Sequence, residues 1–303
     1  TTQSLVVTSE LAKGVAKASC ENNNQENKTS FGRIFKLSTI AIALTGAVNY
    51  ANAAYQVNGS VKNSGDSIAI SGNPKGQANA TGIGERTDTG NIAIGTDSAA
   101  QGGNSVAIGY ESKTRGNGGT AVGQGAKAGV SKDDGSASSA FGYYANAAAS
   151  GSTALGFRTV ASTQQATAVG YQAAASGQGA TALGSNAIAS NQSTIAISAG
   201  PNTTTASGVG SIAIGTNVTS NGTGNIATGA GANATGNGAI ATGSASVANG
   251  NNALAVGTNT NATGAKAIAI GSDSKALKNS SLAIGDAANA KNANDVALGA
   301  GSV

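Results

Sequence analysis

A four-residue pattern, apolar-Ala-apolar-Gly, recurs along this chain, and most copies follow the previous one after fourteen residues. Clear copies are residues 92–95, 106–109, 212–215 and 268–271. The chain contains sixteen such units if the two units with serine at the glycine position, Ser71 and Ser198, are included. A short fixed period is the signature of stacked repeats that each contact only their neighbours.

Each unit has the composition of two short strands and two turns. Alanine stands two positions before the glycine in every unit, and Ile, Val or Leu commonly flank it. Such alternation followed by glycine predicts a short strand that ends in a turn. Small residues three and five positions after the glycine, such as Ser98 and Ala100, predict a second strand. A further glycine, such as Gly102, would supply positive φ for a second tight turn.

Fourteen residues leave no room for a helix beside two strands and two turns, so we expect an all-β chain. The units should stack as coils of a parallel two-sheet β-roll, a solenoid with about 4.8 Å between coils. We expect the branched residues to face the small residues inside the coil, with the alanine where another backbone comes close. The reverse assignment, with the branched residues at a seam between subunits, stays open.

A coil this thin buries little apolar surface, so we expect several chains to associate around the long axis. Melting should then depend on protein concentration.

Charge and composition exclude several classes of function. Only 10% of the residues are charged, and residues 159–265 carry no charge at all. The net charge of +4 therefore forms no basic stripe, and we expect no nucleic-acid partner. The chain has no histidine, and its single cysteine, Cys20, precedes the repeats. We expect no disulfide, no metal site and no cofactor in the repeat region.

The first 53 residues differ from the rest. Basic residues precede an apolar run at residues 37–48, and small residues follow at 51–53. This order predicts a secretory signal peptide that is cleaved after Ala53. We expect the head to begin with irregular repeats at 54–91 and to continue as a regular array at 92–303. The array stops soon after Gly299, so we expect the chain to be a fragment.

Residues 104–112, with the sequence NSVAIGYES, resemble the NSVAIGxxS head motif of trimeric autotransporter adhesins of the YadA-like type. Residues 91–98 and 268–274 are near copies. Residues 3–17 resemble the later half of the extended signal peptide of large type V secreted proteins.

The resemblance implies a trimer of left-handed β-rolls at the tip of a stalk, exported to the bacterial surface and anchored by an outer-membrane barrel. It implies attachment to host matrix proteins (collagen, and also fibronectin or laminin) and to like heads on neighbouring cells. The candidate ligand-binding residues carried over from the motif are Asn104, Ser105, Val106, Ala107, Ile108, Gly109 and Ser112. The alternative is that these residues only build the coil.

Two departures from the period are further candidates, because insertions in a solenoid often bind ligands. One spans residues 127–134 and carries the charged cluster Lys132, Asp133 and Asp134; the other is the uncharged stretch 201–207. Both are also consistent with ordinary surface loops.

An enzyme is not expected, because clustered carboxylates are lacking beyond Asp133 and Asp134. A purely structural spacer, or an ice-binding solenoid with rows of outward threonine, remains as an alternative function.

Overall fold

The computed structural model describes residues 55–57, 59–62, 67–71, 78–81, 90–129 and 137–303. All of them belong to one compact unit, Asn52–Val303. These residues form short strands joined by turns, with no helix among them, as the sequence predicted. The expected signal peptide and the cluster Lys132, Asp133 and Asp134 lie outside the described residues.

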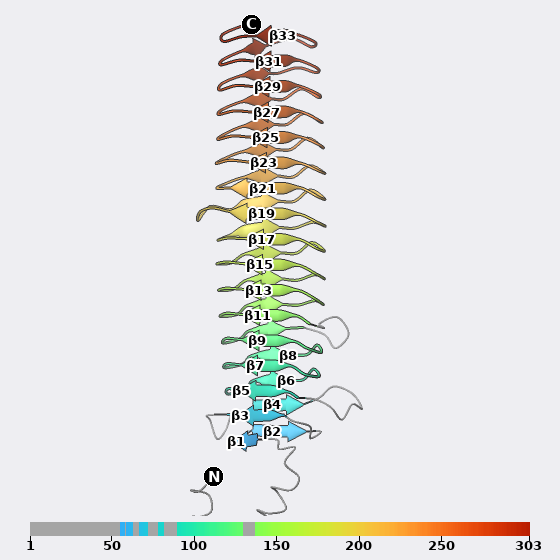
Figure 1. The fold of residues 1–303 in the computed structure, drawn as a ribbon, viewed down its shortest axis with the longest axis vertical. Coiled ribbons are helices and arrows are strands. Elements are labelled where there is room, and N and C mark those ends of the chain that lie inside the picture. Colours follow the sequence, from blue (N-terminus) through green and yellow to red (C-terminus); the bar gives the residue numbers. More distant parts are fainter. Residues whose placement is uncertain (1–54, 58, 63–66, 72–77, 82–89, 130–136) are drawn as a thin grey trace, which may run out of the picture. The chain divides into compact units, whose positions relative to one another are not determined.

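The strands form two parallel sheets, and each coil gives one strand to each sheet (Figure 1). Sheet A contains the odd-numbered strands: β1 (Tyr55–Val57), β3 (Ile68–Ile70), β5 (Ile92–Ile94), β7 (Val106–Ile108), β9 (Thr120–Val122), β11 (Ser139–Phe141), β13 (Thr153–Leu155), β15 (Thr167–Val169), β17 (Thr181–Leu183), β19 (Ile195–Ser198), β21 (Ile212–Gly215), β23 (Ile226–Thr228), β25 (Ile240–Thr242), β27 (Leu254–Val256), β29 (Ile268–Ile270), β31 (Leu282–Ile284) and β33 (Val296–Leu298).

Sheet B contains the even-numbered strands: β2 (Gly59–Lys62), β4 (Ala78–Thr81), β6 (Ala99–Ala100), β8 (Lys113–Thr114), β10 (Lys127–Ala128), β12 (Asn146–Ala147), β14 (Val160–Ala161), β16 (Ala174–Ala175), β18 (Ala187–Ala189), β20 (Thr204–Ala206), β22 (Thr219–Ser220), β24 (Asn233–Ala234), β26 (Val247–Ala248), β28 (Asn261–Ala262), β30 (Lys275–Ala276) and β32 (Asn289–Ala290).

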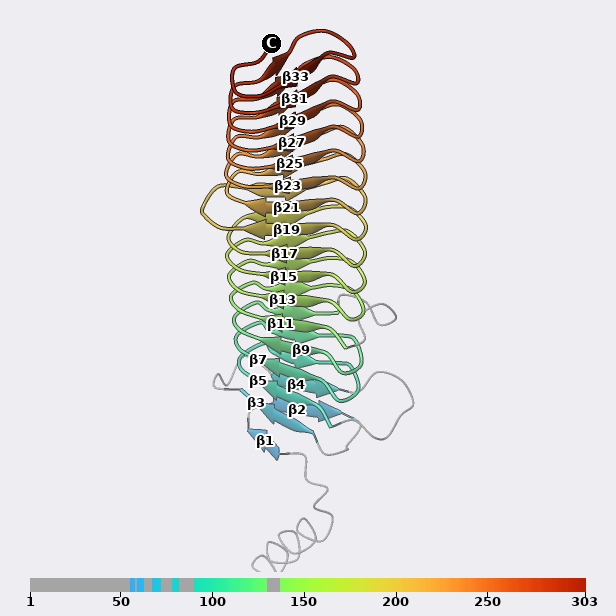
Figure 2. The same cartoon turned by 45° about the horizontal axis from the view of Figure 1, so that its top comes forward.

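Each strand pairs with the equivalent strand of the next coil, as the fourteen-residue period requires. In sheet A, for example, Ala93 of β5 lies opposite Ala107 of β7. Backbone hydrogen bonds continue around the turns, where the N–H of Glu111 donates to the carbonyl of Thr96 at 3.0 Å. Figure 2 shows the turns stacked along both edges of the two sheets.

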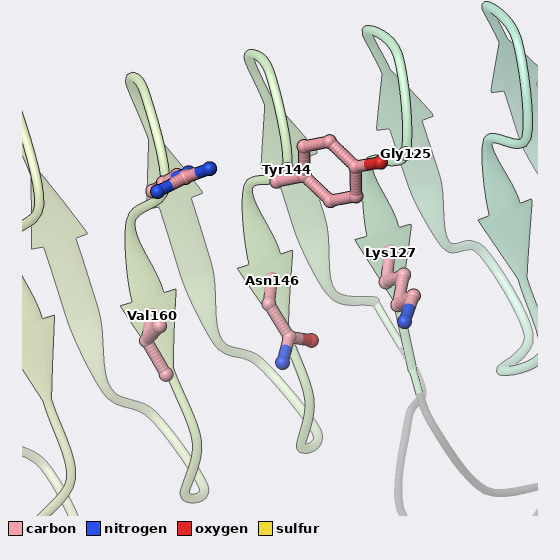
Figure 3. Close-up of a pocket in the computed structure, with 6 residues that line it drawn as sticks. Gly125, Lys127, Tyr144, Asn146 and Val160 are labelled. Atoms are coloured by element: carbon pink, nitrogen blue, oxygen red, sulfur yellow. The ribbon is translucent and has the colours of Figure 1, made fainter.

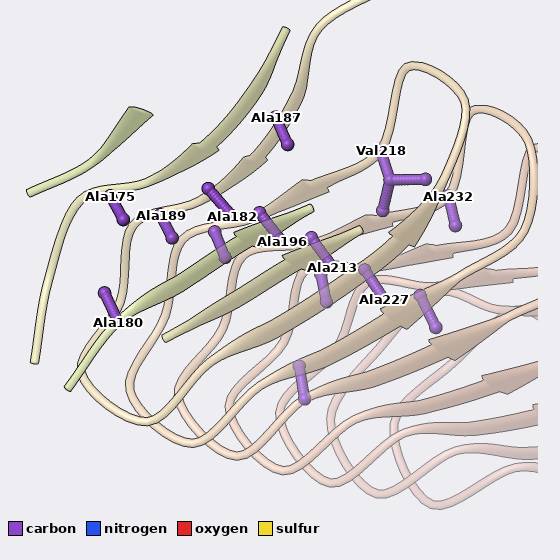
Figure 4. Packing of buried hydrophobic residues seen from close by; sticks show 14 of the residues in the cluster. Ala175, Ala180, Ala182, Ala187, Ala189, Ala196, Ala213, Val218, Ala227 and Ala232 are labelled. Atoms are coloured by element: carbon purple, nitrogen blue, oxygen red, sulfur yellow. The ribbon is translucent and has the colours of Figure 1, made fainter. Parts of the chain in front are cut away.

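The apolar residues of the core are alanine apart from Val218, and buried serine, threonine and asparagine side chains lie among them (Figure 4). The alanine of every sheet A strand from β3 to β33 is buried, as are the small residues that face it from sheet B. The largest apolar side chain in this core is Val218. Our expectation that the branched residues point inward is therefore wrong. Because tight turns hold the two short strands of a coil close together, the interior accepts only small side chains, and valine, asparagine and threonine are the largest found there.

The branched residues instead lie on the outer face of sheet A. Ile92 and Ile94 flank buried Ala93 and are half-exposed, and the same pattern recurs in the following strands. This outward orientation agrees with the reverse assignment that the alternation of side chains had left open, whereas the seam between subunits stays a prediction.

The glycine that ends each sheet A strand is required twice over. Gly156 has φ +132°, which L side chains rarely adopt, and an added Cβ would lie 2.3 Å from the carbonyl oxygen of Gly170. At Ser198 the chain avoids this conformation, because β19 continues through the serine and the backbone then leaves the coil in a loop at 199–203 (Figure 1). The excursion is thus shorter than the predicted 201–207, since residues 204–206 return to sheet B as β20.

The second glycine of the repeat does not supply positive φ, as we had expected. That conformation occurs two residues later, at Asn104 with φ 54°. Gly102 instead permits close approach, because an added Cβ would lie 1.9 Å from the carbonyl oxygen of Gly116 in the next coil.

Candidate functional site

The predicted ligand-binding residues at 104–112 divide between the inside and the outside of the coil. The side chains of Ser105, Ala107 and Ser112 are fully buried. The hydroxyl of Ser105 donates to the carbonyl of Gly102 at 3.0 Å, and that of Ser112 to the carbonyl of Gly109 at 3.0 Å. These two serines therefore close turns of their own coil.

The remaining members of this motif reach the surface. Asn104 is exposed at the turn, whereas Val106 and Ile108 are half-exposed on the outer face of sheet A. Gly109 occupies the glycine position that ends the strand, with φ 124°. The motif thus brings only three side chains to the surface, and a binding role for them stays a prediction.

The outer face of sheet A is an apolar surface that continues from coil to coil. In the C-terminal half its half-exposed members include Ile212, Ile214, Ile226, Ile240, Ile268 and Ile270. A contiguous exposed apolar surface on this scale marks an interaction site, because water solvates it poorly.

Three aromatic rings stack along the turns that follow sheet A. Phe157 lies between Tyr143 and Tyr171, with ring centroids 5.2 Å apart on both sides and interplanar angles of 8° and 4°. Tyr144 meets the edge of this stack, at 4.6 Å and 78° to Tyr143. The guanidinium of Arg158 lies 5.3 Å from the centre of the Phe157 ring, within range of a cation–π contact.

The repeat pattern of glycines and small residues does not predict this aromatic stack. Its signal is present, because Tyr143, Phe157 and Tyr171 are fourteen residues apart and so occupy the same place in three successive coils. The scarcity of aromatic residues elsewhere in the chain makes this coincidence informative.

A surface pocket of about 450 Å³ opens beside Tyr144, whose ring contacts the aromatic stack (Figure 3). It is lined by Gly125, Lys127, Tyr144, Asn146, Arg158 and Val160. Its two charged side chains, Lys127 and Arg158, are both cationic, and no carboxylate lines it. An added Cβ on Gly125 would lie 2.8 Å from the Tyr144 ring, so the absence of a side chain there makes room for the tyrosine.

Tyr110 is exposed on a turn beside Glu111. Its hydrogen bond to the Glu111 carboxylate, together with the charge of that carboxylate, raises the pKa of the Tyr110 hydroxyl above its ordinary value. Tyr110 is therefore a neutral phenol at physiological pH.

Within the described ranges, no group of three His, Cys, Asp or Glu side chains is placed to hold a metal ion. No helix in this part of the chain has the length and apolar character needed to cross a membrane.

The fold and its exposed apolar sheet define a class: a parallel β-solenoid built to present a repeated outer surface. Comparison with protein families finds the YadA head domain repeat at residues 92–112, 134–159, 150–173, 161–187, 175–197, 202–217, 248–274 and 276–302. These segments together cover more than half of the chain. Among curated proteins, the comparison finds no significant match.

The chain therefore belongs to the YadA head domain repeat family. Heads of this type are trimeric autotransporter adhesins displayed at the cell surface. The coils at 218–247, between the matches at 202–217 and 248–274, continue the same structure. There Ile226 of β23 pairs with Ile240 of β25 in unbroken register.

Proposed function

We propose that this chain is the exported head of a homotrimeric adhesin that attaches its cell to host extracellular matrix and to like heads on neighbouring cells. The observation that carries the proposal is the apolar outer face of sheet A, which the single chain leaves half-exposed. A solenoid whose own core is alanine gains further apolar burial only by covering that face.

The occupant of this face, in our proposal, is the same face of two further copies around a common axis. Each coil then adds the same small contact, and many coils together make a stable seam. Membership of a family of trimeric heads supports this arrangement. Left-handed winding of the coils stays an expectation from the family.

Sedimentation equilibrium of the purified chain tests the seam. Wild type should be a trimer, and replacing both Ile226 and Ile240 by lysine should dissociate it, because six charges would then lie in one apolar seam. The matched control replaces Thr219 and Asn233 by lysine. These two residues are neighbours on the outer face of sheet B, so this variant should remain trimeric. A monomeric wild type, or equal dissociation of both variants, would refute the proposal.

The seam restricts which motif residues can touch a matrix protein. Val106 and Ile108 lie on sheet A and would be covered in the trimer, whereas Asn104 at the turn stays accessible. We propose collagen as the first ligand, with fibronectin and laminin as further candidates, and Asn104 as the contact. Ser105, Ala107, Gly109 and Ser112 then act by shaping the coil. Many weak contacts on a trimer would combine through avidity.

Solid-phase capture of collagen tests the role of Asn104. Asn104→Gly removes the side chain yet keeps a conformation that Gly118 already adopts at the same place in the next coil. We expect capture to fall at least fivefold, while Asn252→Gly, at the same place in a distant coil, leaves it unchanged. Unchanged capture by the first variant, in a folded trimer, would favour the alternative that the motif only builds the coil.

The same proposal includes secretion with removal of residues 1–53, display in the outer membrane, and no catalytic role. The family type supports display and adhesion. Amino-terminal sequencing of the exported protein should begin at Ala54.

A further inference from the structure

Basic side chains from separate coils meet on one part of sheet B. Lys113 of β8 and Lys127 of β10 are direct partners in the parallel ladder, and both are exposed. The next partners along the ladder are Asn146 and then Val160. Like charges in neighbouring positions of a sheet repel each other, so this pair costs stability unless an anion lies over it.

The pocket continues this basic row toward the turns. Tyr144 extends from a turn on the side of the pocket opposite Lys127 and Asn146 (Figure 3), and Arg158 lines the pocket from the same place in the next coil. No carboxylate of the described residues pairs with Lys127 or Arg158. Glu111, an acidic side chain on these turns, is hydrogen-bonded to the Tyr110 hydroxyl.

The aromatic stack holds two walls of the pocket in place. Phe157, fixed between two parallel rings, supports the guanidinium of Arg158, and Tyr143 supports the ring of Tyr144. Figure 3 looks onto the face of the Tyr144 ring, and Tyr144 as a whole residue is 41% exposed. The site thus offers cations, an amide and a ring face, which together match a sugar that carries an anionic group.

We propose that this surface binds an anionic polysaccharide laid along the coil axis. A sulfate or carboxylate of one sugar lies between Lys127 and Arg158, the sugar ring packs on Tyr144 and Val160, and Asn146 bonds a hydroxyl. The next anionic group reaches Lys113 one coil away, since the coil spacing of about 4.8 Å is close to the length of one sugar unit.

The stack argues against single-stranded nucleic acid as the occupant. Bases bind such proteins by stacking on free ring faces. Here Tyr143, Phe157 and Tyr171 cover one another, which leaves no row of open faces for successive bases. The site is formed by sheet B and the adjoining turns, and not by the outer face of sheet A where the seam is proposed. Binding of a polysaccharide there does not depend on collagen being a ligand.

Calorimetric titration of the purified chain with size-defined oligosaccharides tests the proposal. The probes are a sulfated heparin fragment, a hyaluronan fragment that carries only carboxylates, neutral dextran, and single-stranded DNA. Wild type should bind at least one of the two anionic fragments more tightly than DNA and should not bind dextran. The two fragments distinguish sulfate from carboxylate recognition.

The decisive variant combines Lys127→Asn and Arg158→Gln. Both substitutions introduce the residue that the next coil carries at the same place, Asn146 and Gln172, so the fold should persist. We expect affinity for the anionic fragment to fall at least tenfold. The matched control, Lys275→Asn with Lys278→Asn, likewise copies Asn289 and Asn292 and removes the same charge, and should change affinity less than twofold.

A third variant separates a sugar site from a purely electrostatic one. Tyr144→Ala should weaken the oligosaccharide at least threefold and leave binding of inorganic polyphosphate unchanged. The proposal fails if no anionic fragment binds, if the two double variants lose affinity equally, if DNA binds more tightly than both fragments, or if Tyr144→Ala weakens both probes alike.

Discussion

The backbone N–H of Ser105 donates to Oδ1 of Asn91 in the preceding coil at 2.9 Å, and the single hydroxyl hydrogen of Ser105 is shared between that Oδ1, at 3.1 Å, and the carbonyl of Gly102, at 3.0 Å. Both side chains are fully buried. The same link recurs farther along the stack, where the N–H of Ala239 donates to Oδ1 of Asn225 at 3.0 Å. A buried asparagine before the sheet A strand therefore joins successive coils in two separate regions.

Replacing Asn91 by leucine should lower the free energy of unfolding by about 1–3 kcal/mol, because the buried N–H of Ser105 loses its acceptor. Ser105→Ala should cost only about 1 kcal/mol, since it keeps that N–H bond and alanine occupies the same place at Ala239. Urea unfolding measures both values. Equal costs would show that the coil-to-coil link contributes little.

Gly156→Ala should destabilise the array by about 3 kcal/mol or more, because the new methyl group meets the carbonyl oxygen of Gly170 and φ is unfavourable. Gly179→Asn is the control, because Gly179 has φ +65°, nothing lies within 4 Å of an added Cβ, and Asn104 adopts the same conformation. It should change stability by less than about 0.5 kcal/mol. Thermal unfolding followed by circular dichroism compares the two variants, and similar melting would contradict the steric role of this glycine.

Ala168→Leu should cost at least about 1–3 kcal/mol, because its side chain points into the alanine core and cannot expand there. Thr167 directly precedes Ala168 and lies on the outer face. Thr167→Leu should be tolerated, since Leu254 and Leu282 occupy that place in other coils. Chemical denaturation of the two variants measures the difference. The reverse order of stabilities would mean that the branched residues line the interior after all.

Glu111→Gln should bring the pKa of Tyr110 down toward its ordinary value, because the substitution removes the carboxylate that raises it. In wild type the folded state holds this proton more tightly than the unfolded state does. The contribution of Tyr110 to stability therefore falls as the pH rises above about 10. Ultraviolet titration measures phenolate formation, and ionisation of Tyr110 should occur at a lower pH in the variant than in wild type. Identical titration curves would refute the link to Glu111.

Sequence reasoning predicted the strands well because the period carries the register. Once Ile94 and Ile108 occupy the same place in a fourteen-residue repeat, parallel pairing of their strands follows. It failed at the end of the 201–207 segment, because nothing in that polar stretch indicates that Thr204 rejoins sheet B. Arg158 and the aromatic stack were not predicted either, because the glycine pattern that defines the repeat does not constrain the turn residues just after the glycine.

The amino-acid sequence by itself determined the repeat, the two parallel sheets and the family, because all three depend on spacing along the chain. Only the tertiary structure decided which face of sheet A lies inside, since strict alternation presents Ala107 on one face and Ile108 on the other with no preference. Distance between the sheets settles that choice: the closed turns leave room for alanine and turn the branched side chains outward. The pairing of Lys113 with Lys127, and the pocket that Lys127 and Arg158 line together, likewise exist only after the coils have stacked.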